Sequence, residues 1–494
     1  MQTGRSLPVE FFKAISERVR FERVLGLIGR MTVKDEVFLG LVVAAIVFPL
    51  ISIRAYHYEE GLTAALAKDA LSGSPWYVPD LFGARWIERP VMQSWIAAAI
   101  SWLLGGVSQI SVRLPTVAAL FAGALLIWGL VRTRVSRPAA LIAALCFLFS
   151  PAVLQKAVTA EADILLSAFE FAAFVVWWRG YEAGRVGAAR WLVVGVLMAA
   201  TALCKGPQPA AFFALGVGAF ILIKRDWKQL PGFVTAGVIS IGILASWYVA
   251  VYRAADVDTL LEYMRLSRNE TIFDYLAYRL RFMTILLTFL PGLLIAAPAL
   301  LDWARRREPA DLAADDRPLF LALVLYATIP IVALVVWPGA ATRYAMPALL
   351  AVAALAGLSF DRLAVRWLDF ARLGLSILAG LIAYQLAWGW IVAPLLPDMF
   401  SKTRIDAHTV EAATRAKPYT VFAPLRLADP VLAYLDRPVR YLEMEELVAL
   451  PAPAYLLAEP QTADMIGGAR KDIAVVLLAT IRYKSLGLYE LAPR

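Results

Sequence analysis

Residues 319–337 read LFLALVLYATIPIVALVVW, a run that contains no charged side chain. A helix of about 20 apolar residues crosses the hydrocarbon core of a bilayer. The whole chain of 494 residues shares this character, with 61% hydrophobic and 18% charged residues and a mean hydropathy of +0.67. Soluble domains average roughly 45–50% apolar and about 25% charged residues. The composition therefore predicts a polytopic membrane protein and argues against a soluble, disordered or nucleic-acid-binding protein.

Ten further apolar runs accompany this one, so the sequence predicts an all-α membrane domain of about 11 transmembrane helices. The run nearest the N-terminus, 37–53, is not a cleavable signal peptide. It follows an arginine-bearing stretch at 9–31, and no small-residue cleavage site comes after it. The other ten runs are 37–53, 112–131, 138–154, 164–178, 191–204, 210–223, 233–252, 282–301, 345–360 and 373–392.

The lysines and arginines of the loops predict the orientation. Alternate loops, beginning with the N-terminal tail, carry 23 basic residues, whereas the opposite loops are longer in total and carry fewer. Loops rich in Lys and Arg stay in the cytoplasm. We therefore expect an inner-membrane protein with a cytoplasmic N-terminus and a periplasmic C-terminus, and we assign the net charge of +9 to loops that face anionic lipid.

Two regions outside the membrane stand out, both on the predicted outer side. The loop 54–111 contains two helical stretches, 58–71 and 93–104, and the second is too short to span, which favours an interfacial helix. The tail 397–494 alternates strand-like and helical runs, so we expect a small periplasmic α/β domain after a transmembrane domain at 1–396. Its expected strands are 419–423, 439–442, 454–458, 473–481 and 488–491, and its expected helices are 430–435 and 443–450.

Charged residues gather at the outer ends of the predicted spans. Ionisable groups near a membrane are costly, and each one alone is most simply an interface anchor. Segments far apart in the sequence nevertheless bring acids and bases to the same membrane face, which favours a binding or catalytic site. The two histidines, His57 and His408, have no metal-ligand partner at a useful spacing. The charged residues concerned are Glu59, Glu60, Glu88, Arg89, Glu161, Asp163, Lys205 and Arg343.

Several of these residues belong to a series of short motifs. In chain order the motifs are Glu59-Glu60-Gly61, Trp76-Tyr77-Val78-Pro79, Trp86-Ile87-Glu88-Arg89-Pro90 with Trp95, Val112-Arg113-Leu114-Pro115, Ala162-Asp163, Leu203-Cys204-Lys205-Gly206-Pro207 and Arg343-Tyr344 with Pro347. In this order they resemble the glycosyltransferases of the GT-C fold that use lipid-linked sugars, specifically the group of the lipid A aminoarabinose transferase and the protein O-mannosyltransferases. The resemblance covers roughly residues 35–360. Two residues depart from the group's pattern, because Glu59 stands where an Asp is usual and Arg89 stands where Lys is common.

The resemblance implies transfer of a sugar from a polyprenyl phosphate, of the undecaprenyl type, to an acceptor at the periplasmic face, with inversion at the anomeric carbon. Negative charge grows on the phosphate as it leaves, and fixed cations in a partly dry site stabilise that charge. An envelope glycolipid such as lipid A is the leading acceptor. The implied roles are catalytic for Glu59 and Asp163, donor-phosphate binding for Lys205, Arg343 and Arg89, and substrate binding for Glu60, Glu88 and Tyr344.

Glu59 has two possible duties. If the acceptor is a hydroxyl, a carboxylate takes its proton, and Glu59 is the first choice. If the acceptor is a lipid phosphate, it is already ionised and Glu59 instead orients the sugar or holds Arg89. Carboxylates such as Glu59 and Asp163 could hold a divalent metal ion, but the cationic neighbours make one unnecessary, so we predict no metal site.

Two other functions compete with this hypothesis. The first is the same chemistry on a protein acceptor, as in O-mannosylation. The second is a transporter or lipid flippase. Such proteins place charged groups and broken helices near the membrane midplane and are built from repeats. The charges here lie at the outer edge and the sequence shows no convincing repeat, which favours the transferase.

Overall fold

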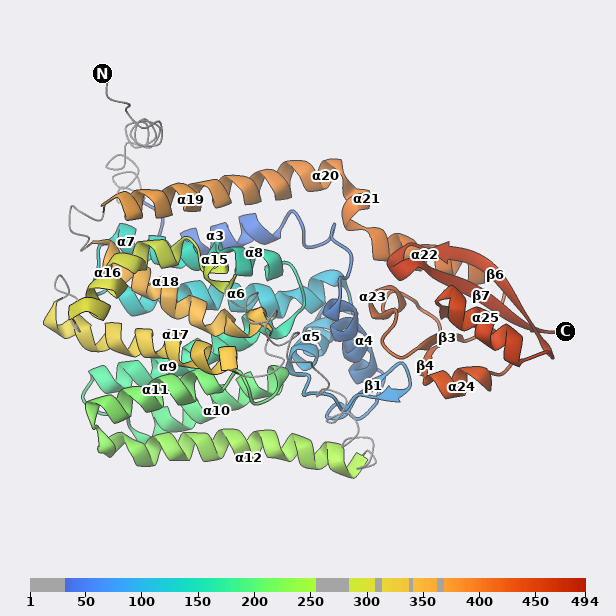
Figure 1. Cartoon of the computed structure of the whole chain (residues 1–494), viewed down its shortest axis with the longest axis horizontal. Coiled ribbons are helices and arrows are strands. Elements are labelled where there is room, and N and C mark those ends of the chain that lie inside the picture. Colours follow the sequence, from blue (N-terminus) through green and yellow to red (C-terminus); the bar gives the residue numbers. More distant parts are fainter. Residues whose placement is uncertain (1–31, 255–283, 307–312, 337–340, 362–367) are drawn as a thin grey trace, which may run out of the picture.

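The computed structural model describes residues 32–254, 284–306, 313–336, 341–361 and 368–494. The stretch 9–31 and parts of the runs 282–301 and 319–337 lie outside these ranges. Helices form the larger, left-hand part of the molecule in Figure 1. They are α3 (Asp35–Val47), α6 (Gln109–Val131), α7 (Arg137–Leu148), α8 (Pro151–Lys156), α9 (Ala162–Glu182), α10 (Ala188–Lys205), α11 (Ala211–Lys224), η1 (Trp227–Gln229), α12 (Leu230–Ala254), α15 (Ile285–Thr288), α16 (Gly292–Arg306), η2 (Ala314–Asp316), α17 (Arg317–Val336), η3 (Thr342–Ala345), α18 (Met346–Phe360), α19 (Leu368–Ala387), η5 (Trp388–Val392) and α20 (Ala393–Leu395).

Six helical segments of the described residues are long and apolar enough to cross a membrane, which confirms the prediction of a multi-span membrane protein. Every one of the eleven predicted runs coincides with a helical segment, but several of these segments are short. The run 138–154 shows why, because it is divided into α7 and α8. The Ser150 side chain accepts a hydrogen bond from the amide of Val153, and Pro151 occupies the first turn, so a new helix begins there.

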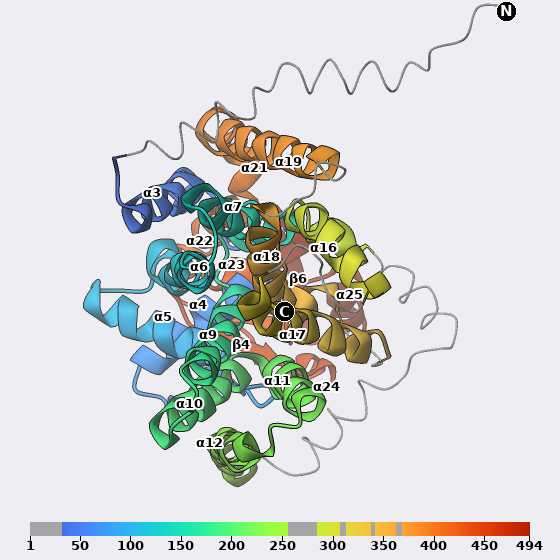
Figure 2. The ribbon, with the colours of Figure 1, turned by 90° about the vertical axis from the view of Figure 1, so that its left-hand side faces the viewer.

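The helices surround α18, as the end-on view in Figure 2 shows. In the apolar span that contains α18, 89% of the residues are buried, against 28% for the span of α12 and 17% for that of α19 at the edges. Small side chains on α18 permit this close packing. A Cβ on Gly357, for example, would lie 2.8 Å from the Cβ of Ala143 in α7. Apolar faces of α12 and α19 remain free to contact lipid.

The loop 54–111 contains the two helices that the sequence predicts. They are α4 (Glu59–Leu71) and α5 (Met92–Leu103), with a short antiparallel pair, β1 (Asp80–Leu81) and β2 (Ala84–Arg85), between them. The end of α5 exposes Trp102 and Leu103, each 73% accessible. This apolar tip fits the expectation of a helix that rests at the membrane interface.

The tail forms a five-stranded mixed sheet. Strands β4 (Val439–Leu442), β3 (Val421–Pro424) and β5 (Ala454–Ala458) are parallel, whereas β5, β7 (Leu486–Pro493) and β6 (Ile473–Ile481) are antiparallel. The order in the sheet is β4-β3-β5-β7-β6. All five expected strands and both expected helices are present, and three α-helices and one 3-10 turn that were not expected accompany them. The elements are α21 (Pro397–Phe400), α22 (Lys402–Thr414), β3 (Val421–Pro424), α23 (Asp429–Leu432), β4 (Val439–Leu442), α24 (Met444–Val448), β5 (Ala454–Ala458), α25 (Pro460–Ala469), β6 (Ile473–Ile481), η6 (Tyr483–Ser485) and β7 (Leu486–Pro493).

The outer loop and the tail share a hydrophobic core. Leu62 and Leu66 of α4 pack in one cluster with residues of α23 and the sheet, such as Leu432 and Leu488. The contact between α4 and α23 is close at Gly61, where an added Cβ would lie 2.5 Å from the backbone of Pro430. Figure 1 shows α4, α5 and β1 between the helical bundle and the sheet. The tail therefore packs directly on the loop that carries Glu59.

Candidate active site

Glu59 lies between two arginines from distant parts of the chain. Its Oε2 is 3.0 Å from Nη2 of Arg89, which precedes α5, and its Oε1 accepts a hydrogen bond of 3.1 Å from Nη2 of Arg343 in η3. The three side chains are 18% to 36% exposed, so the cluster is partly dry but open to solvent. Glu59 is also the first residue of α4, where the positive end of the helix dipole favours a carboxylate.

These cations lower the pKa of Glu59. Burial alone would raise the pKa of Glu59, but the positive charges of Arg89, Lys205 and Arg343 outweigh burial and lower the pKa to about 2. Glu59 is thus ionised at neutral pH. A general base works best when its pKa lies near the operating pH. A carboxylate with so low a pKa is a poor proton acceptor but a strong partner for the two guanidinium groups.

A second ion pair lies beside this cluster. Lys205, the last residue of α10, places its Nζ 2.6 Å from Oδ1 of Asp163 in the first turn of α9, and both side chains are buried. The other oxygen, Oδ2, is 3.9 Å from Nζ of Lys156, which is also paired with Glu161. The charge of Lys205 contributes to lowering the pKa of Glu59, and the charge of Asp163 contributes to raising the pKa of Arg89. The two clusters therefore form one charged region.

The motif Lys205-Gly206-Pro207 owes its spacing to the end of α10. Gly206 has a φ of +98°, a conformation that side-chain-bearing residues rarely adopt, and its amide donates to the carbonyl of Ala202. The chain turns away after Gly206, so Lys205 ends the helix facing Asp163. Tyr344 completes the region, because its ring centre lies 5.5 Å from Nζ of Lys205.

Glu60 faces away from this region. It forms a fully buried ion pair with Arg113 of α6, whose Nε donates to Oε1 at 2.8 Å and whose Nη2 donates to Oε2 at 3.0 Å. The amides of Ala160 and His57 also donate to its two oxygens. All four bonds keep the carboxylate away from solvent, so Glu60 joins α4 to α6 and leaves no oxygen free for a substrate.

Glu88 faces the tail. It pairs with Arg426, whose guanidinium lies 4.9 Å from the ring centre of Trp86. The indole N–H of Trp86 donates to the carbonyl of Arg89 at 2.9 Å. Arg426 thus contacts Trp86 and Glu88 in the segment that presents Arg89 to Glu59.

Six of the eight predicted site residues lie together in the structure, whereas the other two pair with residues outside this cluster. Three residues that support the site were missed by the sequence reading. Arg113 stood in a quoted motif, whereas Lys156 and Arg426 carry no local signal. Among the described residues no three His, Cys, Asp or Glu side chains form a group that could hold a metal ion, so the metal question stays a prediction. The six residues are Glu59, Arg89, Asp163, Lys205, Arg343 and Tyr344, and the other two are Glu60 and Glu88.

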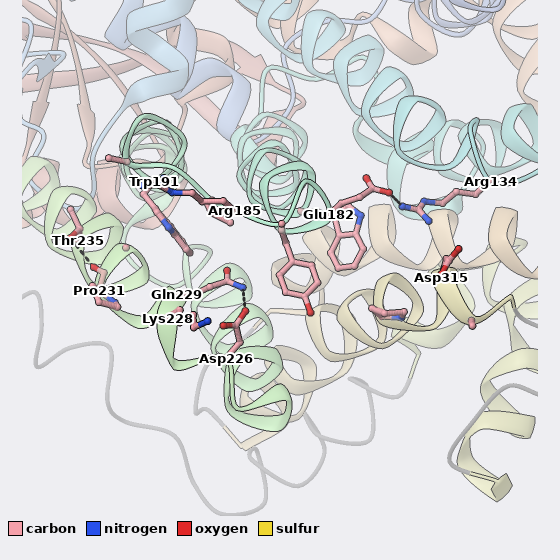
Figure 3. Close-up of a pocket in the computed structure, with 18 residues that line it drawn as sticks. Arg134, Glu182, Arg185, Trp191, Asp226, Lys228, Gln229, Pro231, Thr235 and Asp315 are labelled. Atoms are coloured by element: carbon pink, nitrogen blue, oxygen red, sulfur yellow. Dashed lines mark hydrogen bonds and ion pairs between the residues drawn. The ribbon is translucent and has the colours of Figure 1, made fainter.

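A cavity of about 1220 Å³ lies at the opposite ends of the helices, lined by residues of the predicted cytoplasmic loops such as Arg185 and Lys228 (Figure 3). None of the predicted site residues lines it. Its polar side chains largely pair with one another, as in Arg134 with Glu182 and Gln229 with Asp226. We therefore do not place the chemistry there, although the cavity is large.

Comparisons with known proteins agree with the motifs. A family model described as dolichyl-phosphate-mannose-protein mannosyltransferase matches residues 88–249. An undecaprenyl phosphate-alpha-4-amino-4-deoxy-L-arabinose arabinosyl transferase of Edwardsiella ictaluri is 28% identical over 42% of this chain and 38% of its own length. The transferase of the same name from Pseudomonas paraeruginosa is 25% identical over 65% of this chain and 60% of its own length. The matched segments thus span less than two thirds of these relatives.

The fold is identified by its similarity to a solved structure. The crystal structure of ArnT from Cupriavidus metallidurans bound to undecaprenyl phosphate matches with a TM-score of 0.70 and 16% identity, over 92% of this chain and 97% of that one. This chain has the fold of ArnT. The resemblance to the GT-C transferases that the motifs predicted is therefore confirmed.

Proposed function

We propose that the chain is an integral-membrane glycosyltransferase that moves a sugar from a polyprenyl phosphate to lipid A at the periplasmic face. The observation that carries this proposal is the cluster of Arg89, Arg343 and Lys205 around one carboxylate, on the predicted outer ends of the helices. Three cations in a partly buried site form a site for the phosphate of the donor. The similar ArnT structure was solved with undecaprenyl phosphate bound, which supports the same class of donor here.

In the proposed reaction, an oxygen of the acceptor attacks the anomeric carbon of the sugar from the face opposite the phosphate. The bond from that carbon to the phosphate oxygen breaks, its electron pair stays on the phosphate, and the configuration inverts. Arg89, Arg343 and Lys205 stabilise the charge that develops on the leaving phosphate. Asp163 holds Lys205 in place through their buried ion pair.

The low pKa of Glu59 favours one of its two duties. A hydroxyl acceptor needs a base, and a carboxylate with a pKa of about 2 accepts a proton poorly. A phosphate of lipid A is already ionised and needs none. We therefore propose that the acceptor group is a lipid phosphate, and that Glu59 orders the two arginines before the donor binds.

The finer topology belongs to the same proposal. About eleven spans with a cytoplasmic N-terminus would place the charged cluster, the outer loop and the tail together in the periplasm. Because the tail shares a core with the outer loop, we propose that residues 54–111 and 397–494 act as one periplasmic unit on the transmembrane part. A transporter is disfavoured because the described charged cluster lies at helix ends rather than within a broken helix.

The test is a transfer assay with the purified full chain in proteoliposomes. Undecaprenyl phosphate–aminoarabinose and lipid A are supplied, and lipid mass spectrometry follows the acceptor. The proposal predicts an increase in the mass of lipid A by one sugar residue together with release of undecaprenyl phosphate. Transfer to a supplied protein acceptor but not to lipid A would support the O-mannosyltransferase-like alternative. Movement of the donor across the bilayer without transfer would support the flippase.

A further inference from the structure

Glu170 is a carboxyl group in the middle of α9 that none of the steps above uses. Its side chain is fully buried, and it lies about two helical turns beyond Asp163 on the same helix. An ionisable group inside a membrane span is costly, so its presence invites a functional explanation. The amide of Phe213 donates a hydrogen bond of 2.6 Å to its Oε1, whereas no residue that the structure describes bonds to Oε2. The carboxyl group is therefore directed at the backbone of α11.

This hydrogen bond caps α11 from another helix. Phe213 lies in the first turn of α11, where backbone amides have no acceptor within their own helix. The residue just before a helix usually supplies the acceptor from its side chain, with its own backbone extended. Ala210 holds this place, but it has no polar side chain, and its φ of −61° and ψ of −13° are helical. Glu170 thus provides the cap that the start of α11 lacks, at the positive end of the helix dipole.

The capped end of α11 is joined to Lys205 by a short turn. Residues 206–210 connect Lys205, the last residue of α10, with α11. Gln208 of this turn lines a small hollow beside Lys205. Asp163 and Tyr344 line the same hollow, which holds only about 10 Å³, about the least that admits one water. A shift of the turn would therefore change the walls of the space beside Lys205.

One helix holds both ends of this turn. Before the turn, Lys205 is bound by Asp163, with 2.6 Å between Nζ and Oδ1. After the turn, the amide of Phe213 is bound by Glu170. Both acids belong to α9, and α10 and α11 both pack against α9 (Figure 1). The place of Lys205 relative to α9 thus depends on two contacts, of which the ion pair is only one.

We propose that Glu170 is a positioning residue for the donor site, because it caps α11 and thereby fixes the turn 206–210 and the place of Lys205. This inference rests on the proposed function, in which Lys205 stabilises the charge on the leaving phosphate. Glu170 acts through Lys205 and touches no substrate. Its contribution depends on the reach of its side chain to the amide of Phe213, and not on its charge.

Two substitutions separate reach from charge. Glu170→Gln keeps an oxygen at the same reach but loses the charge, whereas Glu170→Asp keeps the charge and is one methylene too short. With the full chain in nanodiscs, Glu170→Asp should lower kcat about tenfold or more at a nearly unchanged donor KM, because misplacement of a catalytic group slows the chemical step. Glu170→Gln should keep kcat near the wild type. Glu182→Asp, the same change at the other end of α9, should leave kcat unchanged.

Hydrogen–deuterium exchange without substrates separates this inference from the proposed function. In Glu170→Asp the amides of residues 206–214 should exchange faster than in the wild type, whereas those of α18 should not change. Such local exchange, together with no sugar transfer by the wild type, would support the cap and contradict the proposed function.

Three results would overturn the positioning role. The first is unchanged exchange of residues 206–214 in Glu170→Asp. The second is a lower melting temperature of Glu170→Asp with the kcat of the wild type, which is the result of a purely structural role. The third is a loss of kcat in Glu170→Gln, which would show that the charge matters; this arm decides alone if Glu170→Asp does not fold.

Discussion

Arg89→Gln removes the strongest of the positive charges that act on Glu59. The side chain of Gln retains a hydrogen-bond donor but carries no charge. The substitution therefore tests whether the cation cluster works through electrostatics. Because the related transferases commonly carry Lys at this position, Arg89→Lys is the matched control that keeps the charge and loses only the planar fork.

The magnitude follows from the pKa of Glu59. Its ordinary value is 4.5, and the cations outweigh burial to lower it to about 2. This difference corresponds to about 3 kcal/mol in favour of the ionised carboxylate. Since the pKa is lowered, the contribution to folding is complete above pH 4.5 and is lost as the pH falls towards 2. Without Arg89 the pKa of Glu59 rises, so acid unfolding should begin at a higher pH.

The same charge stabilises the leaving phosphate in the proposed reaction. Removal of one preorganised group that stabilises a developing charge typically lowers kcat by about 10²–10³-fold. Initial rates in nanodiscs at saturating donor should show this loss of kcat for Arg89→Gln and a much smaller loss for Arg89→Lys. Tryptophan fluorescence during acid titration measures the pH at which each protein unfolds. The reasoning would be refuted by an Arg89→Gln protein that keeps kcat within about threefold of wild type. Equal inactivity of the Lys and Gln variants would refute the electrostatic part.

Three further predictions concern the support of the site. Gly61→Ala should destabilise the contact with Pro430 by about 1–3 kcal/mol and make the tail more sensitive to limited proteolysis, whereas Gly468→Ala, which meets no neighbouring atom, should not. Arg426→Ala should lower kcat several-fold at unchanged acceptor KM, with Arg426→Lys recovering activity, because Arg426 only positions the Arg89 segment; an unchanged kcat would remove it from the account. Lys205→Ala should lower both activity and the melting temperature, because the buried Asp163 loses its partner at a cost of about 3–5 kcal/mol; wild-type melting behaviour would show that this pair is not structural.

The apolar runs and the strand pattern predicted the elements well, because both depend on local periodicity. All eleven runs coincide with helical segments, and all five strands of the tail lie where they were expected. The break at Ser150-Pro151 was missed, although a serine followed by proline is a known signal for a helix start. The apolar character of the run 138–154 continues through this break, so hydropathy alone shows one segment where the structure has two.

The sequence predicted that the charged residues of the site would lie on one face, but it did not predict which of them pair with each other. Glu59 and Glu60 are neighbours of the same type, yet one faces two partly exposed arginines and the other a fully buried one. A helix turns by about 100° per residue, so adjacent side chains point in different directions, and the partner of each depends on tertiary packing. Arg426 shows the same limit, because it reaches Glu88 across 338 positions of the chain with no local pattern to announce it.

The shared core explains why the tail could not be assigned a role from sequence. Its strands look like those of a separate domain, but Leu62 and Leu66 of α4 complete its core. The tail therefore contacts α4, which carries Glu59, and the segment that carries Arg89. No motif within the tail records this, because the contact involves ordinary apolar residues and one arginine.

The most direct test of the central claim is the mass of lipid A after incubation with the reconstituted full chain and undecaprenyl phosphate–aminoarabinose. The account predicts an increase by one sugar residue on a phosphate of lipid A, with an initial rate that is about 10²–10³-fold lower for Arg89→Gln at equal protein and close to wild type for Arg89→Lys. An unchanged mass of lipid A with active, folded protein that glycosylates a different acceptor would contradict it.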